Sequence, residues 1–150
     1  MSQQFFEDLA LGQKFASAPR PVDAAAIKSF AAEFDPQPFH LDETAAKSSL
    51  FGGLAASGWH TAAITMRLCL SSDFRPAGGI IGGGGELVWS KPVRPGDALR
   101  VEIQVLERRT SRSRPAHGLV KVRIETLNQY GETVQTFSPT LLVERRPNQR

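Results

Sequence analysis

The chain has 150 residues, of which 41% are hydrophobic and 22% are charged, a composition typical of a globular domain with a core of its own. The net charge is +3, and the single cysteine excludes an internal disulfide and a cysteine metal cluster. No apolar run approaches the roughly 18 residues of a membrane span, and acids occupy the N-terminus where a signal peptide has its basic region. We therefore expect one cytoplasmic domain over residues 1–150, with a flexible tail from about residue 145 to 150.

The first part of the chain predicts a short strand and then a helix. Residues 12–22 predict a strand that ends at prolines, and residues 23–34 place apolar side chains at helical spacing behind a suitable N-cap residue, Asp23. The prolines of the stretch FDPQPFH, residues 34–40, cannot continue that helix because each removes a backbone donor. They also push the residues before them toward extended conformations, so we expect a stiff, non-helical loop there.

Two more helices are expected before the chain changes character. Asp42 is placed to cap a short helix over residues 43–49. Residues 59–70 predict a longer helix that is apolar nearly all round, and such a helix is buried on most of its faces. The glycine run at residues 78–85 lacks the Gly-Lys-Ser/Thr ending of a phosphate-binding loop. We interpret it as a loop that leads into a sheet and lets another backbone or a ligand come close.

The second half of the chain predicts four consecutive strands. Segments rich in β-branched residues lie at residues 85–93, 97–110, 118–129 and 133–144, and turns rich in Pro, Gly, Ser or Asn separate them. Strands joined by short links form an antiparallel sheet. Because a long apolar helix precedes these strands, the most economical packing wraps the sheet around the helix. The sequence therefore predicts an α+β fold without an internal repeat or a linker.

Asp35 and His40, which flank the two prolines, are candidates for chemistry. A carboxylate and an imidazole can bind one water molecule together, so that one removes its proton and the other donates a proton to a substrate. This arrangement suits the addition or removal of water at a double bond conjugated to a carbonyl group. Taken alone the pair is a weak signal, because an acid and a histidine at this spacing are more often structural.

Such a reaction also needs donors for the carbonyl oxygen as it gains negative charge. The backbone N–H groups at a helix start can supply them, helped by the helix dipole. In AASGWHTAA, residues 55–63, Ser57 is placed to cap a helix and Gly58 lets a thioester oxygen approach the backbone closely. The order of acid, prolines, histidine and then Ser-Gly at a helix start is a stronger indication of an active site than any one of these features.

In that order, residues 30–63, FAAEFDPQPFHLDETAAKSSLFGGLAASGWHTAA, resemble the hydratase-2 motif of the MaoC-like dehydratases, which include the (R)-specific enoyl-CoA hydratases. Asp35, Pro38 and His40 stand at the Asp, Pro and His of this motif. Gly58 stands at the glycine whose N–H contributes to the oxyanion hole in the family. The later segment VWSKPVRPGDAL, residues 88–99, is also similar to the strand and turn that follow the central helix in this family. The resemblance covers about residues 5 to 145 and implies the hot-dog fold, an antiparallel sheet wrapped around a long central helix.

Two positions depart from the family pattern. Phe34 stands at the motif's Gly, and Gln37 stands at its Asn. Gln37 can keep the amide hydrogen bond that orients the loop, whereas Phe34 is expected to narrow or reshape the acyl pocket. Neither change removes a catalytic group. We therefore expect Gln37, with Ser57 and Gly58, among the oxyanion- and substrate-binding residues.

The resemblance implies a hydro-lyase of fatty acid metabolism that adds water to a trans-2-enoyl thioester, gives the (R)-3-hydroxyacyl thioester, and also catalyses the reverse reaction. We expect His40 to act as the base toward water at C3 and Asp35 as the proton donor at C2, although the reverse assignment is also chemically sensible. No metal is expected, because the sequence offers no convincing ligand set. No cofactor is expected either, because the coenzyme A thioester is itself the substrate.

The partners follow from charge and from the resemblance. Arg109, Arg112 and Arg114 are candidates for binding the phosphates of coenzyme A. The basic cluster has no interleaved aromatic residues, which disfavours nucleic acid as the partner. The substrate would be an acyl-CoA or an acyl group on acyl carrier protein. The resemblance implies a homodimer, or a dimer or trimer of dimers, and a partner would also protect the edge strand of a single sheet.

Three alternatives remain open. An acyl-CoA thioesterase on the same scaffold would place an acid on the central helix, and residues 59–70 contain no Asp or Glu. A non-catalytic acyl-thioester-binding or regulatory module would lose the pair that Asp35 and His40 form. The third alternative is an interaction subunit that needs a partner to complete its site.

Overall fold

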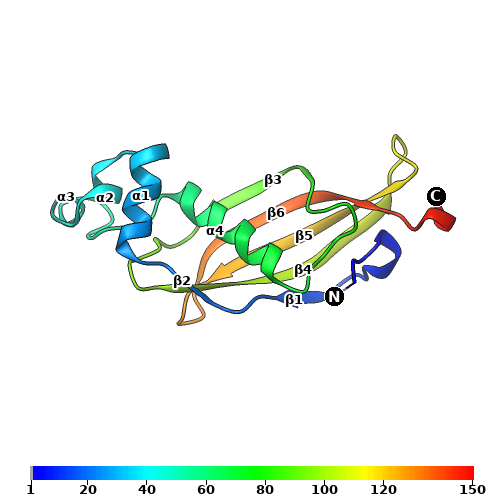
Figure 1. Cartoon of the computed structure of the whole chain (residues 1–150), viewed down its shortest axis with the longest axis horizontal. Coiled ribbons are helices and arrows are strands. Elements are labelled where there is room, and N and C mark those ends of the chain that lie inside the picture. Colours follow the sequence, from blue (N-terminus) through cyan, green and yellow to red (C-terminus); the bar gives the residue numbers. More distant parts are fainter. Residues whose placement is uncertain (1) are drawn as a thin grey trace.

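The computed structural model describes residues 2–150 as a sheet with one helix laid across it and smaller helices at one end (Figure 1). The helical elements are the 3-10 turn η1 (Phe6–Asp8), α1 (Ala24–Phe34), α2 (Pro38–Leu41), α3 (Glu43–Lys47), α4 (Gly58–Ser71) and the 3-10 turn η2 (Pro147–Gln149). The strands are β1 (Lys14–Ala16), β2 (Arg20–Pro21), β3 (Gly82–Trp89), β4 (Ala98–Thr110), β5 (His117–Leu127) and β6 (Thr133–Glu144). The four strands predicted for the second half are therefore confirmed.

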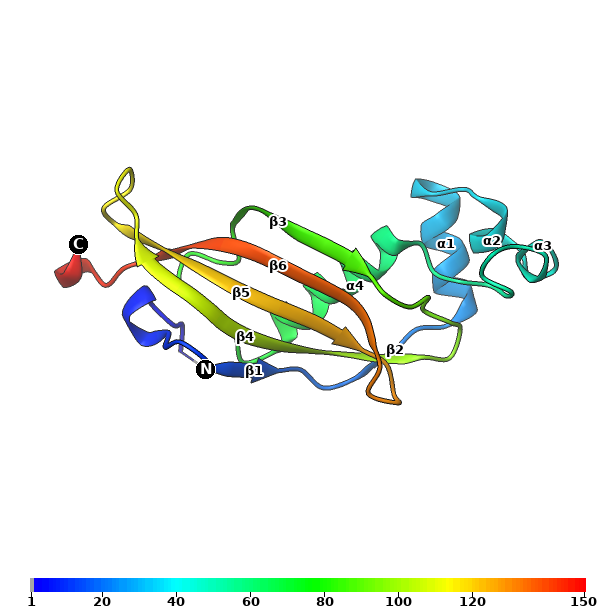
Figure 2. The same ribbon diagram turned by 180° about the vertical axis from the view of Figure 1, so that it is seen from behind.

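All strand pairs in the sheet are antiparallel. The strand order is β1-β4-β5-β6-β3, and the short β2 also pairs with β4. Ile103 of β4 lies opposite Ile124 of β5, which in turn lies opposite Phe137 of β6. β3 pairs only with β6, so its other side is an open edge within the described chain. Figure 1 and Figure 2 show α4 crossing one face of the curved sheet, while the opposite face has no helix.

Alternating side chains place the core between α4 and the sheet. Along β5, buried residues alternate with half-buried ones, so one face of the strand is apolar. That face packs against Ile64, Leu68 and Cys69 of α4 in one hydrophobic cluster. Each fully buried Val, Leu or Ile contributes about 1.5–3 kcal/mol relative to an exposed one. The predicted α+β fold, a sheet around a central helix, is therefore confirmed, and Cys69 is the small buried hydrophobe of this core.

Two aspartates begin helices as predicted. The Oδ1 atom of Asp23 accepts the Ala26 N–H at 2.8 Å and caps α1. The Oδ1 atom of Asp42 accepts the Thr44 N–H at 3.0 Å and caps α3. α1 ends at Phe34, one residue before Asp35, as the following proline requires. The end of α1 at Phe34 and the Asp42 cap fix where the segment between α1 and α3 starts and stops.

The segment expected to be a non-helical loop is partly helical. Pro38 opens α2, a helix of four residues that includes His40. Proline suits the first position of a helix because its missing N–H would have no helical partner there. Gln37 is extended, with φ −98° and ψ 144°, as expected for a residue before proline. The prediction for residues 34–40 is therefore wrong in its second half, and a helical turn holds His40.

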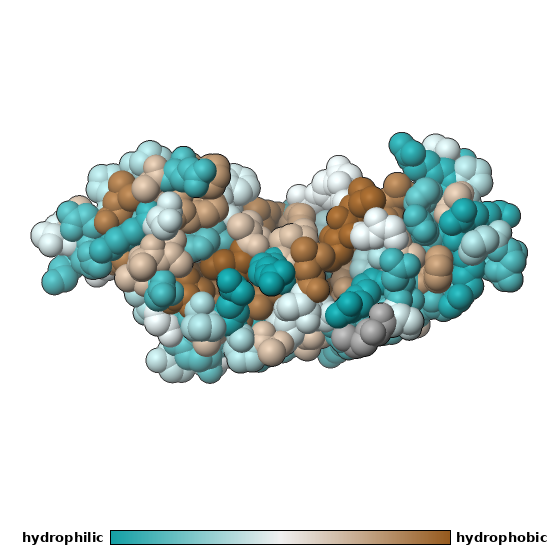
Figure 3. All heavy atoms as spheres, in the orientation of Figure 1, coloured by the Kyte–Doolittle hydropathy of each residue, from teal (hydrophilic) through white to brown (hydrophobic). Residues whose placement is uncertain are grey.

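α4 is less buried than its composition predicts. Ile64, Leu68 and Cys69 lie in the core, but Trp59 is 60% exposed and Leu70 is 54% exposed. Figure 3 shows hydrophobic residues gathered along the middle of the face that α4 occupies. The prediction of burial on most faces is therefore wrong for the single chain. Hydropathy shows that a surface is apolar, but it does not say whether the same chain covers it.

The last four residues of the glycine run, residues 82–85, form the first part of β3. The register between β3 and β6 shifts between Gly82 and Gly85. A Cβ atom on Gly85 would lie 2.5 Å from the Cα atom of Pro139, so only glycine lets the two strands approach this closely. The expected close approach of another backbone is confirmed, although residues 82–85 belong to the strand itself rather than to a loop.

The C-terminal segment contacts η1. The side chain of Arg145 binds Glu7 at 2.9 Å, and that of Arg146 binds Asp8 at 2.6 Å. The proposal of one domain over residues 1–150 with a flexible end stays a prediction. Among the helices of residues 2–150, none combines the length and the apolar character that crossing a membrane requires.

Candidate active site

Asp35 and His40 come together at the end of the molecule that α1 and α2 form. Asp35 is the C-cap residue that follows α1, and its N–H donates to the Ala31 carbonyl at 2.8 Å. His40 follows on the helical turn of α2, and its Nε2 atom lies 3.3 Å from Oδ2 of Asp35. The His40 side chain is 5% exposed and that of Asp35 is 17% exposed. The predicted pair therefore exists as a contact, mostly withdrawn from solvent but still accessible at the carboxylate.

The backbone fixes the orientation of the His40 ring. Its Nδ1 atom lies 2.6 Å from the carbonyl oxygen of Ala55. A carbonyl oxygen can only accept a hydrogen bond, so Nδ1 holds a proton and donates it. The other ring nitrogen, Nε2, faces Asp35 and carries no proton in the neutral ring. This selection of one tautomer by a backbone acceptor is what a proton-transfer histidine needs.

Gln37 and Ser57 act on Asp35. The Nε2 atom of Gln37 donates to Oδ1 of Asp35 at 2.6 Å, so the amide hydrogen bond expected for Gln37 is present. Burial alone would raise the pKa of Asp35, but the Gln37 amide, the Ser57 hydroxyl and the charge of His40 together lower that pKa below the ordinary value of 3.8. Asp35 is therefore a carboxylate near neutral pH. Its Oδ2 atom is left for His40 or for a bound water.

A cavity of about 360 Å³ opens over the pair. Its lining residues are Asp35, Gln37, His40, Phe51, Ala56, Gly58, Trp59, Thr61, Trp89, Ser90, Lys91, Pro92 and Val93. The three other residues expected at the substrate site differ in whether they line this cavity. Gln37 and Gly58 line the cavity, whereas Ser57 is fully buried beneath it and caps α4 by accepting the Trp59 N–H at 3.2 Å. Ser57 is therefore a supporting residue rather than part of the cavity wall.

Phe34 does not shape this cavity. Its side chain is 65% exposed and packs on Phe30, with the ring centroids 5.1 Å apart. It is absent from the cavity wall. The expectation that Phe34 narrows the acyl pocket is therefore wrong for the single chain, because the last turn of α1 directs the side chain outward. Phe51, from the segment between α3 and α4, lines the cavity instead.

Gly58 has a packing role that the sequence did not indicate. It is the first residue of α4, and its N–H has no acceptor within the described chain. A Cβ atom at Gly58 would lie 2.6 Å from Cε2 of Trp89, so glycine makes room for the indole ring. The Nε1 atom of Trp89 donates to Gln135 at 2.9 Å, and Gln135 donates to Thr65 of α4 at 3.0 Å. A partly buried chain of hydrogen bonds thus holds Trp89 against the start of α4.

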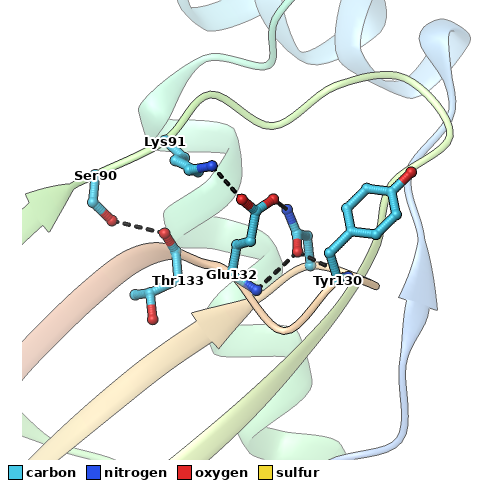
Figure 4. A network of polar contacts seen from close by, with 6 residues as sticks. Ser90, Lys91, Tyr130, Glu132 and Thr133 are labelled. Atoms are coloured by element: carbon cyan, nitrogen blue, oxygen red, sulfur yellow. Dashed lines mark hydrogen bonds and ion pairs between the residues drawn. The ribbon is translucent and has the colours of Figure 1, made fainter.

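The segment after β3 forms another wall of the cavity and is tied to the turn between β5 and β6. Ser90 donates from its hydroxyl to the Thr133 carbonyl at 2.9 Å, and Lys91 pairs with Glu132 (Figure 4). Glu132 also accepts from the Asn128 side chain at 3.0 Å. Because Lys91 is already paired, this wall adds little uncompensated charge to the cavity.

The three arginines proposed for phosphate binding lie elsewhere. Arg109 and Arg114 line a separate hollow of about 570 Å³ together with glycines of β3, and Arg112 is exposed on the turn between β4 and β5. Figure 1 shows this turn at the opposite end of the sheet from α1. Within one chain, these arginines therefore do not line the cavity that contains Asp35 and His40. Among residues 2–150, no three His, Cys, Asp or Glu side chains lie together as metal ligands.

Comparison with known proteins identifies the family and the fold of the chain. The family model described as "MaoC like domain" matches residues 7–127. The crystal structure of a MaoC-like dehydratase from Rhodospirillum rubrum is 60% identical, with a TM-score of 0.93 over 96% of this chain and 99% of that one. An R-hydratase from Pseudomonas aeruginosa is 26% identical, with a TM-score of 0.75 over 95% of this chain and 86% of that one.

A relative from Bacillus subtilis, the uncharacterized protein YdeM, is 33% identical over 141 residues, which are 93% of this chain and 98% of that protein. The family model and the two structures agree with the sheet wrapped around α4. The chain belongs to the MaoC-like domain family and has its hot-dog fold.

Proposed function

We propose that this protein is an enoyl-thioester hydratase: it adds water across the double bond of a trans-2-enoyl thioester, yields the (R)-3-hydroxyacyl thioester, and catalyses the reverse dehydration. The observation that supports this best is the 3.3 Å approach of Asp35 Oδ2 and His40 Nε2 in a cavity that the start of α4 also lines. The similarity to an R-hydratase supports the same reaction class and the (R) product.

The proposed addition moves a proton from water to C2 through the pair. Water bound between the pair attacks C3, Asp35 takes one of its protons, and the π electrons move toward the thioester oxygen. The resulting enolate oxygen accepts a hydrogen bond from the Gly58 N–H at the positive end of α4. The Asp35 carboxyl group passes this proton to Nε2 of His40, and the imidazolium that forms then donates it from Nε2 to C2. One water is consumed and both side chains end as they began.

The lowered pKa of Asp35 favours this order over the one expected from the sequence, in which His40 takes the proton from water. A carboxylate that is already ionised near neutral pH begins the reaction as an acceptor. Asp35 is the side chain in the pair whose hydrogen bonds, from Gln37 and from the Ser57 hydroxyl, stabilise the ionised form. The pair still titrates as a unit, so the two roles are coupled.

The stereochemical outcome tests the proposed function. We expect the protein to dehydrate (R)-3-hydroxybutyryl-CoA and to leave the (S) enantiomer unchanged, because both side chains approach the substrate from one side. Formation of the enoyl-thioester absorption band reports the reaction for each enantiomer. Turnover of the (S) form, or turnover of neither, would contradict the proposal, and binding without turnover would favour a non-catalytic acyl-thioester-binding module. A thioesterase is disfavoured because α4 contains no acid.

We expect Gln37→Leu to move the acid limb of the kcat/KM profile to higher pH. The substitution removes the 2.6 Å hydrogen bond to Asp35, so the pKa of Asp35 rises and the carboxylate is lost earlier as the pH falls. A titration of the Asp35 carboxyl group by carbon-13 NMR measures the same shift without substrate. Gln104→Leu, on the sheet away from the cavity, serves as the control. An unchanged Asp35 titration in Gln37→Leu would rule out this role for Gln37.

The arginine hollow belongs to the proposal only if two copies of the chain associate. β3 has an open edge; one end, at Trp89, borders the Asp35 cavity, and the other, at residues 82–84, borders the arginine hollow. Antiparallel pairing of two β3 edges about a two-fold axis would set the hollow of one copy beside the cavity of the other. A homodimer of this kind would also cover Val88 and Trp89, which are 45% and 44% exposed.

The carrier can be tested through the arginines. We expect the double substitution Arg109→Gln and Arg114→Gln to raise KM for crotonyl-CoA about tenfold or more, because charge-assisted contacts to the phosphates are lost. The KM for crotonyl-pantetheine, which lacks the nucleotide phosphates, should stay the same. Steady-state kinetics with both substrates measures the difference. An equal rise for both substrates, or no rise for either, would exclude these arginines as the phosphate site.

A further inference from the structure

Arg94 stands on a rigid turn between β3 and β4. Its backbone N–H donates to Oδ2 of Asp97 at 2.9 Å, and the Asp97 N–H donates to the Arg94 carbonyl at 3.1 Å. Asp97 is buried and its Oδ1 atom accepts from Gln129 at 2.9 Å. The Arg94 backbone is thereby fastened to the end of the sheet. The family resemblance and the proposed reaction assign no role to this side chain.

The guanidinium group of Arg94 binds three backbone carbonyls of one segment. Its Nη1 atom donates to the Gly53 carbonyl at 2.9 Å and to the Leu54 carbonyl at 3.3 Å, and its Nη2 atom donates to the Phe51 carbonyl. Among residues 2–150, Arg94 forms no ion pair, so its donors serve this segment. A planar guanidinium with five donors suits this geometry, and a lysine ammonium does not.

The segment that Arg94 holds leads directly to the acceptor for His40. Residues 48–57 contain no helix or strand, so side chains and single backbone contacts determine their path. Ala55 follows the three bound carbonyls and accepts from His40 Nδ1 at 2.6 Å. Its neighbour Ala56 donates to the Val93 carbonyl, next to Arg94, at 2.9 Å. Phe51 from the same segment packs near the His40 ring, with centroids 5.9 Å apart.

We propose that Arg94 is a positioning residue for His40: it holds the Ala55 carbonyl in place, and that carbonyl keeps the proton on Nδ1 and turns Nε2 toward Asp35 and the cavity. Without the guanidinium group, residues 51–54 lose three hydrogen bonds at once. The Ala55 carbonyl then no longer selects one tautomer of His40. A proton-transfer group displaced by about 1 Å can lose a hundredfold in rate. The kinetic part of this inference rests on the proposed hydratase function, and the tautomer part does not.

Two substitutions separate positioning from folding. We expect Arg94→Gln to lower kcat for crotonyl-CoA hydration roughly 10- to 100-fold with little change in KM, because proton transfer rather than binding is disturbed. Arg94→Lys should show the same loss, since one ammonium cannot bridge three carbonyls. Arg100→Gln, which removes a partly exposed arginine paired with Glu102 at 2.6 Å, is the matched control and should leave kcat unchanged. Methylguanidinium added to Arg94→Ala should restore part of kcat.

Nitrogen-15 NMR of the His40 ring gives a readout independent of activity. The wild-type protein should show the proton on Nδ1, and both Arg94 variants should show a mixture of tautomers while circular dichroism stays native. If folded Arg94 variants keep the Nδ1–H signal and the wild-type kcat, or lose thermal stability alone, the inference is wrong. If the wild type itself does not hydrate enoyl thioesters but the tautomer signal changes in the variants, the proposed function fails and the positioning role stands.

Discussion

Asp35→Asn and His40→Ala should each lower kcat/KM for crotonyl-CoA by at least about a hundredfold, the range expected when a general acid or base is removed. Asparagine has nearly the shape of aspartate but cannot take the proton from water, so Asp35→Asn removes the base and keeps the contact with Gln37. Alanine at position 40 removes the imidazole that lies 3.3 Å from the carboxylate. The measurement is steady-state hydration followed by loss of the enoyl-thioester absorption band.

The controls separate chemistry from stability. His117→Ala removes another histidine, at the start of β5 and outside the cavity, and should keep the wild-type kcat/KM. Glu102→Gln neutralises an exposed acid of β4 and should also be silent. Circular dichroism and thermal unfolding establish that each variant is folded. A folded Asp35→Asn or His40→Ala with nearly wild-type kcat/KM would remove that residue from the proposed mechanism.

Gly58→Ala should lower kcat by about 10² to 10³, comparable to the loss of one oxyanion donor. The added Cβ atom would lie 2.6 Å from Trp89, so the indole ring or the first turn of α4 must move. Trp89 is not free to swing away, because its Nε1 atom is hydrogen-bonded to Gln135 at 2.9 Å. The strain therefore falls on the helix start that offers the Gly58 N–H. Steady-state kinetics on crotonyl-CoA measures the loss.

A second substitution tests the cause of that loss. In Gly58→Ala combined with Trp89→Leu, the smaller side chain removes the clash and should restore part of kcat relative to Gly58→Ala alone. Gly83→Ala is the matched control for kcat, since a Cβ atom there meets nothing within 4 Å. Because Gly83 borders the arginine hollow, the comparison uses kcat rather than KM. If Gly58→Ala is as active as wild type, the N–H at this position does not hold the enolate oxygen. A double variant less active than Gly58→Ala would show that Trp89 contributes to the site on its own.

The sequence predicted the elements whose signals are local. Asp23 and Asp42 cap helices as expected because a cap is a contact between neighbours in the chain. The strands of the second half were found because the alternation along β4, β5 and β6 matches a sheet with one buried face. The pair of Asp35 and His40 was found because the motif that includes them is also local.

The helical turn at Pro38 was missed, and so were features that depend on distant contacts. The turn at Pro38 became helical because its missing N–H suits a helix start, and sequence reasoning alone counted the two prolines only as helix breakers. The exposed face of α4 could not be inferred because hydropathy does not identify what covers it. Trp89, at the end of β3, lines the cavity, and Arg94, between β3 and β4, binds the segment before Ala55. In the sequence, only the similarity of residues 88–99 to the family marked this region. The small residue at position 58 was noted, but its indole neighbour was not.

The most direct single measurement is the absorbance of crotonyl-CoA mixed with the wild-type protein and, in parallel, with His40→Ala. We predict that the enoyl-thioester band falls with the wild type, that the product is (R)-3-hydroxybutyryl-CoA, and that His40→Ala leaves the band nearly unchanged. A wild type that leaves the band of crotonyl-CoA and of longer and branched enoyl-CoAs unchanged, while folded, would contradict the proposed hydration by Asp35 and His40.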